Sequence, residues 1–186
     1  MTISIRQATP QDAKKVAPLI YDAIGYIANN LTGEQELPNI FASLEQFVTE
    51  KTNRHSYLNT FVAVQNEDIL GIVVLYDGKQ GDLLDRQLEK QLASHNIHVT
   101  LDLEAHDDEY YIDTICVAQQ ARGLGIGTKL LQFAEHQGRE LGYKKISLNV
   151  ELEKVDARRL YERTGYVVTE GWTIINEPFH HMVKPL

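Results

Sequence analysis

The stretch ICVAQQARGLGIGTKLL, residues 115–131, places three glycines where a helix is expected to begin. Gly123, Gly125 and Gly127 follow Arg122 directly, and the apolar run YYIDTICV (110–117) before them predicts a central strand. A loop between a buried strand and a helix N-terminus presents unpaired backbone N–H groups at the positive end of the helix dipole. Glycines allow such a backbone to close around a phosphate. The stretch therefore predicts a phosphate-binding loop, with a tight turn that needs positive φ as the structural alternative.

The spacing of the glycines shows which known class of phosphate-binding loop the stretch matches. A P-loop requires Gly-Lys followed by Ser or Thr, whereas the order here is Gly127-Thr128-Lys129. A dinucleotide-binding fingerprint requires G-x-G-x-x-G, and the last glycine comes one residue too early. Glu151 does lie at the end of the next predicted strand, where an acid that binds ribose would sit. The loop nevertheless lies late in the chain, after a predicted hairpin, which disfavours a dinucleotide-binding domain.

Outward from this stretch, hydrophobic periodicity predicts alternating strands and helices. We expect strands over 2–8, 144–152, 166–175 and 180–186, a hairpin over 59–78, and helices over 9–27, 40–52, 82–96, 128–141 and 154–165. The acidic segment VTLDLEAHDDE (99–109) is expected to be a loop or an irregular strand. This order is typical of an α/β (α+β) fold in which helices flank a mixed sheet. At 186 residues we expect one domain over 1–186.

Composition narrows the classes of function. The formal net charge of -8 argues against a nucleic-acid partner. A single cysteine, Cys116, excludes an internal disulfide, and a buried apolar role is expected for it. The N-terminal residues have neither the basic start nor the apolar run of a signal peptide, and no apolar stretch is long enough to span a bilayer. We therefore expect a cytoplasmic protein without a membrane partner.

Two separated motifs resemble one family. Arg122-x-x-Gly125-x-Gly127 matches the R/Q-x-x-G-x-G/A motif of the GNAT superfamily, the GCN5-related N-acetyltransferases. LNVELEKVDARRLYERTGY (148–166) is similar to the next strand and helix of that family. The resemblance covers about residues 108–170 and implies a single-domain GNAT fold, with a mixed, mostly antiparallel sheet splayed at the cofactor-binding strand. It also implies acetyl-CoA as co-substrate and direct transfer of its acetyl group to a primary amine of a small molecule or peptide.

The resemblance implies roles for particular residues. Backbone amides of the glycine loop would hold the pyrophosphate of acetyl-CoA, and the strand before it would pair with the pantetheine arm. Lys154 stands where many relatives have asparagine, and a lysine there would reach a cofactor phosphate. The expected cofactor-binding residues are Ile115, Val117, Arg122, Gly123, Leu124, Gly125, Ile126, Gly127, Thr128 and Lys154.

Tyr161 and Asp113 are the expected catalytic residues. By helical spacing alone Tyr161 is equally a core aromatic, but the resemblance implies that its hydroxyl points to the cofactor sulfur and stabilises the leaving thiolate. Asp113 is a charged residue inside an apolar strand, which is costly unless the carboxylate is paired or used. It is therefore either a proton acceptor for the amine or a structural carboxylate. The acidic run Glu104, Asp107, Asp108 and Glu109 is either a solvated loop or the source of a side chain that reaches the amine.

Several alternatives remain open. A catalytically silent module that binds or senses acyl-CoA would keep the same fold, and a dinucleotide-binding oxidoreductase is the third alternative. No metal is expected, because His180 and His181 lack a third ligand at plausible spacing. The fold is compatible with a homodimer formed through the C-terminal strands, which no sequence feature establishes.

Overall fold

The computed structural model describes residues 2–186, and its strands form one seven-stranded sheet in the order β1-β2-β3-β4-β5-β7-β6. Neighbouring strands are antiparallel except β4 and β5, which are parallel. The strands are β1 (Ser4–Gln7), β2 (Thr60–Gln65), β3 (Asp68–Asp77), β4 (Tyr110–Val117), β5 (Lys145–Glu151), β6 (Val167–Ile174) and β7 (Glu177–Pro185). The expected mixed, mostly antiparallel sheet is confirmed.

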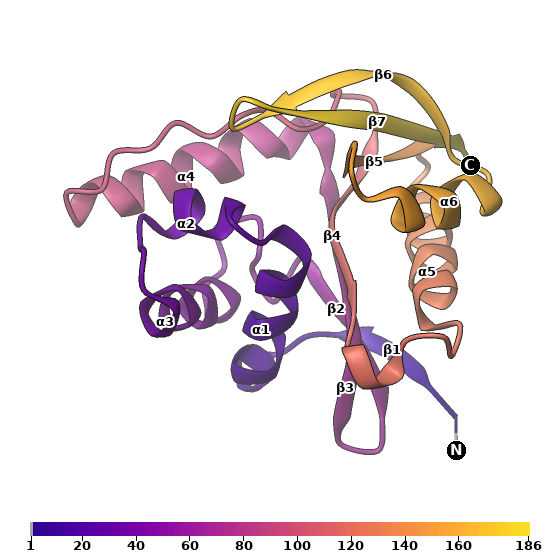
Figure 1. The fold of residues 1–186 in the computed structure, drawn as a ribbon, viewed down its shortest axis with the longest axis horizontal. Helices are drawn as coiled ribbons and strands as arrows, with labels where there is room; N and C mark the ends of the chain where they lie inside the picture. The colour runs from indigo at the N-terminus through magenta and orange to yellow at the C-terminus, as the bar shows by residue number, and fades with distance from the viewer. Residues whose placement is uncertain (1) are drawn as a thin grey trace.

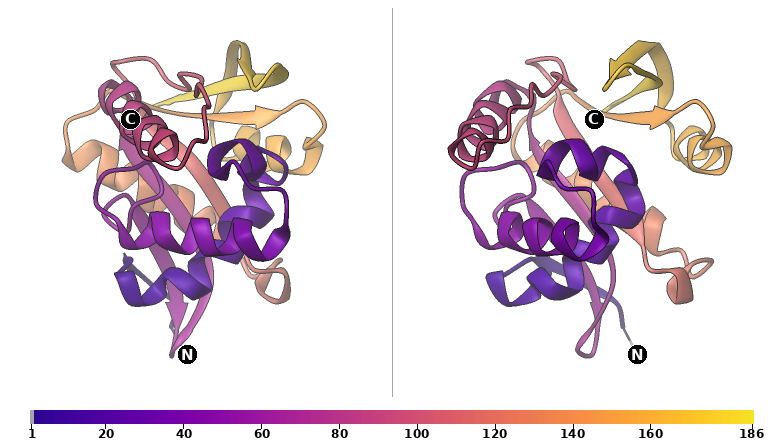
Figure 2. Two further views of the ribbon diagram at one scale, coloured as in Figure 1. Left: turned by 90° about the vertical axis from the view of Figure 1, so that its left-hand side faces the viewer. Right: turned by 60° about the vertical axis from the view of Figure 1, so that its left-hand side comes forward.

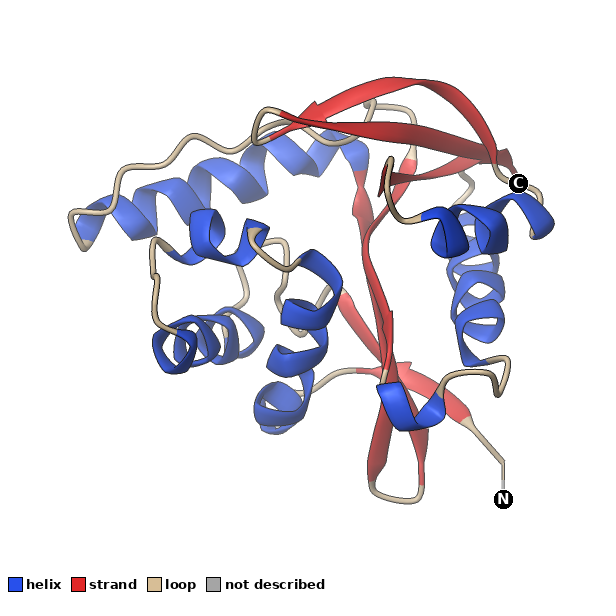
Figure 3. Cartoon of the chain, in the orientation of Figure 1, coloured by secondary structure: helices blue, strands red, loops and turns tan. Residues whose placement is uncertain are grey.

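Helices cover the sheet from both sides. Figures 1 and 3 show α1, α2, α3 and α4 on one side of β4, and α5 and α6 on the other. The turned views of Figure 2 show the same division. The helices are α1 (Ala13–Ile24), α2 (Ile27–Thr32), α3 (Leu37–Thr49), α4 (Gly81–Ser94), α5 (Ile126–Glu140) and α6 (Val155–Arg163). Among the described residues, no helix is both long and apolar enough to cross a bilayer.

The helix expected over 9–27 ends at Ile24, and a separate short helix, α2, begins at Ile27. Gly25 adopts a positive φ of 53°, which ends α1 at Ile24 and redirects the chain into α2. The next helix begins at Leu37, three residues before the expected start, because Pro38 occupies its first turn, where a missing N–H costs nothing. The segment 97–109 is a loop without strand structure, one of the two expected alternatives.

The start of α1 is fixed by an ion pair with β1. Arg6 donates two hydrogen bonds, of 2.7 and 2.9 Å, to the carboxylate of Asp12, and the backbone N–H and hydroxyl of Thr9 donate to the same carboxylate. These donors, Arg6 foremost, lower the pKa of Asp12 to about 2. The pair therefore joins the first strand to the first helix.

The sheet opens between β4 and β5. Only Tyr110–Ile112 of β4 pair with β5, at Ile146–Leu148, whereas β4 pairs with β3 from Tyr110 to Val117 with one irregularity at Asp113. Figure 1 shows the two strands diverging beyond this short contact. The expected splay is confirmed. In the described chain, residues 113–117 of β4 thus have a strand on one side alone, and their other edge faces the space that holds the candidate site.

Candidate active site

The glycine loop combines a turn with open space. Gly123 and Gly125 have φ values of 79° and 75°, and Gly125 is the residue that precedes α5. A Cβ at either position would have no atom within 4 Å. Gly127 has no positive φ; a Cβ there would lie 3.4 Å from Leu160 of α6 and 3.7 Å from Val117. The turn alternative therefore accounts for the conformation of Gly123 and Gly125, and close packing accounts for Gly127. The space beside the first two glycines is free for a ligand.

A groove of about 960 Å³ runs from this loop to α6. It is walled by the end of β4, the start of α5 and the exposed face of α6. The members of the predicted cofactor-binding set all line it except Leu124, whose side chain is exposed. We call it the glycine-loop groove; from the predicted set it includes Ile115, Val117, Arg122, Gly123, Gly125, Ile126, Gly127, Thr128 and Lys154.

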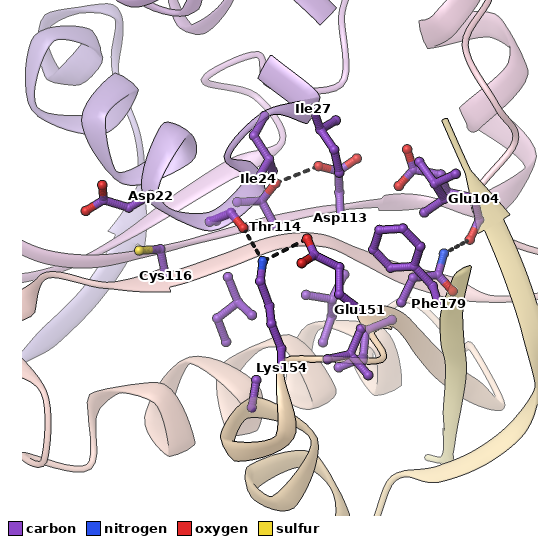
Figure 4. Close-up of a pocket in the computed structure, with 18 of the residues that line it drawn as sticks. Asp22, Ile24, Ile27, Glu104, Asp113, Thr114, Cys116, Glu151, Lys154 and Phe179 are labelled. Atoms are coloured by element: carbon purple, nitrogen blue, oxygen red, sulfur yellow. Dashed lines mark hydrogen bonds and ion pairs between the residues drawn. The ribbon is translucent and has the colours of Figure 1, made fainter. Parts of the chain in front are cut away.

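A smaller inner cavity, of about 250 Å³, adjoins the groove. It lies against the unpaired edge of β4, the end of α1, α2 and the end of β5, and Figure 4 shows side chains from these elements pointing into it. The residues shared by the two spaces are Ile115, Cys116, Val117, Arg122, Lys154, Ala157 and Tyr161. A molecule in the groove and a molecule in the inner cavity would therefore meet beside Tyr161.

Tyr161 is buried, with 8% of its surface exposed, and burial raises its pKa to about 12. The ring of Tyr161 packs against the ring of Tyr166. No group of the described chain forms a hydrogen bond with the hydroxyl of Tyr161. The hydroxyl is thus a protonated and uncommitted hydrogen-bond donor at the junction of the groove and the cavity.

Two cationic side chains, those of Arg122 and Lys154, lie near this junction. The Nε of Arg122 donates to the carbonyl of Val117 at 3.3 Å, at the edge of the groove. The Nζ of Lys154 donates to the carbonyl of Ala23 at 2.8 Å and lies 3.0 Å from the carboxylate of Glu151 (Figure 4). Lys154 therefore links the start of α6 to the end of α1 across the mouth of the inner cavity.

Asp113 lies in the wall of the inner cavity within a dense set of donors. One oxygen accepts from Tyr76 at 2.9 Å and lies 3.3 Å from Arg54; the other accepts from Thr114 at 2.8 Å and lies 3.2 Å from His55. Burial alone would raise the pKa of Asp113, but Arg54 and His55 hold it well below its usual range. Asp113 is therefore an ionised carboxylate whose oxygens are already occupied.

Glu104 is the member of the acidic run that reaches the inner cavity. Its carboxylate accepts from Arg54 and from the hydroxyl of Tyr111 at 2.8 Å, and Asn149 donates to its backbone carbonyl at 2.8 Å. Burial raises its pKa, against the effect of Arg54. Asp108, by contrast, pairs with Lys145 outside the cavity.

Sequence reasoning missed the residues that surround these carboxylates. Arg54 and His55 come from the turn between α3 and β2, and both are almost fully buried. Arg54 also donates to Asp85 of α4 at 2.6 and 3.0 Å. The only signal in the sequence is the run Asn53-Arg54-His55-Ser56, which reads as an ordinary polar turn.

The lining of the inner cavity includes four carboxylates, those of Asp22, Glu104, Asp113 and Glu151, and three cations, those of Arg54, Arg122 and Lys154. Three carboxylates, those of Asp85, Glu104 and Asp113, surround the single guanidinium of Arg54. An ammonium group entering the inner cavity would complement the excess of carboxylates.

Comparison with known families now decides the class of protein. The model of the acetyltransferase (GNAT) family matches residues 28–166. The chain belongs to the GNAT family. This is a family of acetyltransferases, and its members use acetyl-CoA as the acetyl donor.

Individual GNAT relatives support this assignment. The chain is 31% identical over 98 residues to an aminoalkylphosphonate N-acetyltransferase of Salmonella typhimurium, a match that spans 48% of this chain and 64% of that protein. It is 25% identical over 172 residues to YhfO of Bacillus subtilis, an uncharacterized N-acetyltransferase, covering 91% and 93% of the two chains. The crystal structure of an N-acetyltransferase from Staphylococcus aureus Mu50 superimposes with a TM-score of 0.82 at 25% identity, over 97% and 99% of the chains. Solved structures with this fold include complexes with CoA.

Proposed function

We propose that this GNAT protein is an acetyl-CoA-dependent N-acetyltransferase that transfers the acetyl group directly from the thioester to a primary amine of a small molecule or peptide. The observation that carries the proposal is the meeting of two spaces beside Tyr161. The glycine-loop groove, of about 960 Å³, has backbone N–H groups at the start of α5 that suit a nucleotide cofactor. The inner cavity has negative charge for an amine.

The donor would lie along the glycine-loop groove. Backbone N–H groups between Gly123 and Thr128, at the N-terminus of α5, would hold its pyrophosphate, with Arg122 at the rim. The pantetheine arm would pair with backbone groups of Ile115 and Val117, whose edge has no strand partner in the described chain. This placement brings the thioester to the junction.

In the reaction, the nitrogen lone pair attacks the thioester carbonyl, the carbon–sulfur bond breaks, and the amine gives up a proton. Tyr161 would donate a hydrogen bond to the sulfur as negative charge develops there. With the tyrosine pKa at about 12 and a thiol near 8.5, complete proton transfer to the thiolate would be uphill by about 5 kcal/mol. Tyr161 therefore acts by hydrogen bonding rather than as a strong acid.

The amine must lose its proton before attack, which costs roughly 4 to 5 kcal/mol at pH 7 for a pKa near 10.4. Asp113 stays a predicted catalytic residue, but an ionised carboxylate with its oxygens already occupied is a weak proton acceptor. The oxygens of Glu104 also accept hydrogen bonds, from Arg54 and Tyr111, but Glu104 is the better acceptor because burial raises its pKa and it lines the same cavity. In this arrangement Asp113 orients Arg54 and His55.

To test the proposal, turnover is measured with a panel of amines, and the released CoA thiol is detected. Glu104→Gln is expected to lower kcat/KM about 100-fold. Asp107→Asn, which alters an exposed acid of the same loop, is expected to match the unaltered protein. If Asp113→Asn removes the acidic limb of the pH profile while Glu104→Gln retains it, Asp113 is the proton acceptor instead. Tight binding of acetyl-CoA without turnover of any amine would identify a silent acyl-CoA-binding module.

A further inference from the structure

A second cluster of ligand-type side chains lies outside the active site. One ligand atom each from His106, Glu109 and His181 lies within 4.8 Å of the other two. The first two side chains come from the loop before β4, and His181 comes from β7. The neighbouring His180 turns away and contacts Arg158 at 3.0 Å. The fold thus supplies the partners for His181 that spacing along the chain does not reveal.

His181 is fully buried, and its ring orientation is fixed by Asn149. The Nδ2 of Asn149 donates to the carbonyl of Glu104 and to the hydroxyl of Tyr111, so that its Oδ1 faces His181 at 2.7 Å. The Nδ1 of His181 must therefore be the donor in this contact, and Nε2 is directed at Glu109. A histidine whose one nitrogen donates to a fixed oxygen and whose other nitrogen is directed at further ligands is the usual arrangement at a metal site.

Glu109 is held in the matching orientation. The side chain is 1% exposed, and one of its oxygens accepts from Ser147 at 2.8 Å and from the backbone N–H of His106 at 3.1 Å. The same oxygen forms a hydrogen bond of 3.1 Å with Nε2 of His181, a contact that an entering ion would replace. Ligand atoms on a tetrahedral Zn²⁺ with bonds of about 2.0–2.1 Å are separated by roughly 3.3 Å. The nearby Lys145 lies closer to Asp108, at 2.9 Å, than to Glu109, at 3.6 Å.

His106 gives the cluster a route to solvent. Its side chain is 47% exposed, and its Nε2 lies 2.7 Å from the carboxylate of Glu170 on β6. Its ring packs edge-on against Trp172 and against His181, with centroids 5.0 and 5.5 Å apart. One ligand is therefore accessible to an entering ion, while the other two are buried and oriented in advance.

We propose that His106, Glu109 and His181 bind a divalent transition metal ion of the Zn²⁺ class, with water as a fourth ligand. Two imidazoles and one carboxylate form a ligand set that suits Zn²⁺ and disfavours Ca²⁺ or Mg²⁺, which prefer oxygen ligands. The ion would join the loop before β4 to the β6–β7 hairpin. The three ligands lie outside the inner cavity, and Asn149, which contacts both His181 and the carbonyl of Glu104, joins the two sites.

To test the site, the metal-free full chain is titrated with Zn²⁺ alone and the heat of binding is measured by calorimetry. We expect one ion per chain and a rise in Tm, because an ion bound to the folded state stabilises it. His106→Ala is expected to weaken binding at least about tenfold. His98→Ala removes another exposed histidine of the same loop and is expected to leave the affinity unchanged. Co²⁺ in place of Zn²⁺ is expected to give the visible absorption of a four-coordinate ion.

Absence of stoichiometric binding would overturn the proposal, as would equal affinity of His106→Ala and the unaltered chain. Equal weakening by His98→Ala would also overturn it, since scattered surface histidines would then explain the binding. Glu109→Gln offers a second variant, and circular dichroism establishes that it is folded before its affinity is compared. If Glu109 is a buried ligand of the ion, we expect the folded Glu109→Gln variant to lose Zn²⁺ binding. None of these readouts uses acetyl transfer.

Discussion

Tyr161 shows how burial sets the chemistry of a single side chain. A phenol whose pKa is raised to about 12 is neutral at any physiological pH, so the hydroxyl proton is always present. Because the described chain offers this hydroxyl no partner, its hydrogen-bonding capacity is left for a ligand.

Tyr161→Phe is expected to lower the rate of the chemical step by about 100-fold while acetyl-CoA affinity changes little, because the hydroxyl acts as charge develops on sulfur. Single-turnover kinetics measures that step. Tyr166→Phe is the matched control: its ring lies 6.2 Å from that of Tyr161, and its buried hydroxyl has no partner. Equal single-turnover rates for Tyr161→Phe and the unaltered protein would remove the leaving-group role.

The ion pair between Asp12 and Arg6 makes the stability of the folded chain depend on pH. The pKa of Asp12 is lowered from 3.8 to about 2 in the folded chain, so the ion pair with Arg6 contributes stability above pH 3.8. That contribution is lost as the pH falls through 2. Asp12→Asn is expected to cost about 1–2 kcal/mol at pH 7, since Arg6 is partly exposed and solvent screens the pair. Denaturant unfolding at pH 7 and pH 2 measures the difference, and exposed Asp107→Asn is the control. An equal loss at both pH values would contradict the assignment.

At the scale of elements, local patterns predicted most of the fold. The strand, glycine loop and helix around residues 110–140 were predictable because their periodicity and turn residues act locally. The break at Gly25 was missed because the apolar spacing continues across it, and only the backbone conformation of that glycine ends the helix.

The glycine-loop groove was largely predictable, and the wall of the inner cavity was not. The end of β4, the loop and the start of α5 are consecutive along the chain, and the second motif, over residues 148–166, predicted α6. Arg54, Glu104 and Asp113 meet only when a turn after α3 and an irregular loop fold against β4. No periodicity marks such contacts, because they depend on tertiary approach.

Gly125→Ala is expected to weaken acetyl-CoA binding at least about tenfold, because its Cβ would enter the space proposed for the pyrophosphate. Gly142→Ala is a close control: Gly142 has φ of 84°, no atom would lie within 4 Å of its Cβ, and it is outside both spaces. The backbone strain in a left-handed conformation, roughly 1–2 kcal/mol, is thus similar in both variants. Calorimetric titration of both variants with acetyl-CoA therefore distinguishes the effect of backbone strain from the loss of the ligand site at Gly125. Equal affinity in the two variants would place the pyrophosphate elsewhere.

At the scale of the whole molecule, two groups of elements meet at the open sheet. The first contains α1 to α4 with β1 to β4, the second contains α6 with β5 to β7, and α5 packs against β3 and β4 as well as β5. Their strands join through three residue pairs between β4 and β5. Lys154 adds a side-chain link across the gap.

Binding of CoA is expected to slow hydrogen exchange in residues 113–117, since the pantetheine arm would pair with an edge that is now free. Mass spectrometry of peptides from β4 measures the change, and peptides from β2 serve as the internal control. The same experiment with NAD is expected to leave both unchanged. Protection of β4 by NAD but not by CoA would favour the dinucleotide alternative.

The junction at Tyr161 has a consequence for the choice of substrates. On the proposed function, the acyl group and the amine share the inner cavity of about 250 Å³, because the thioester arrives at its entrance. Each carbon added to the acyl chain then removes room from the acceptor. Longer acyl-CoA molecules would therefore act as competitors of bulky amines, and a small amine would tolerate them best.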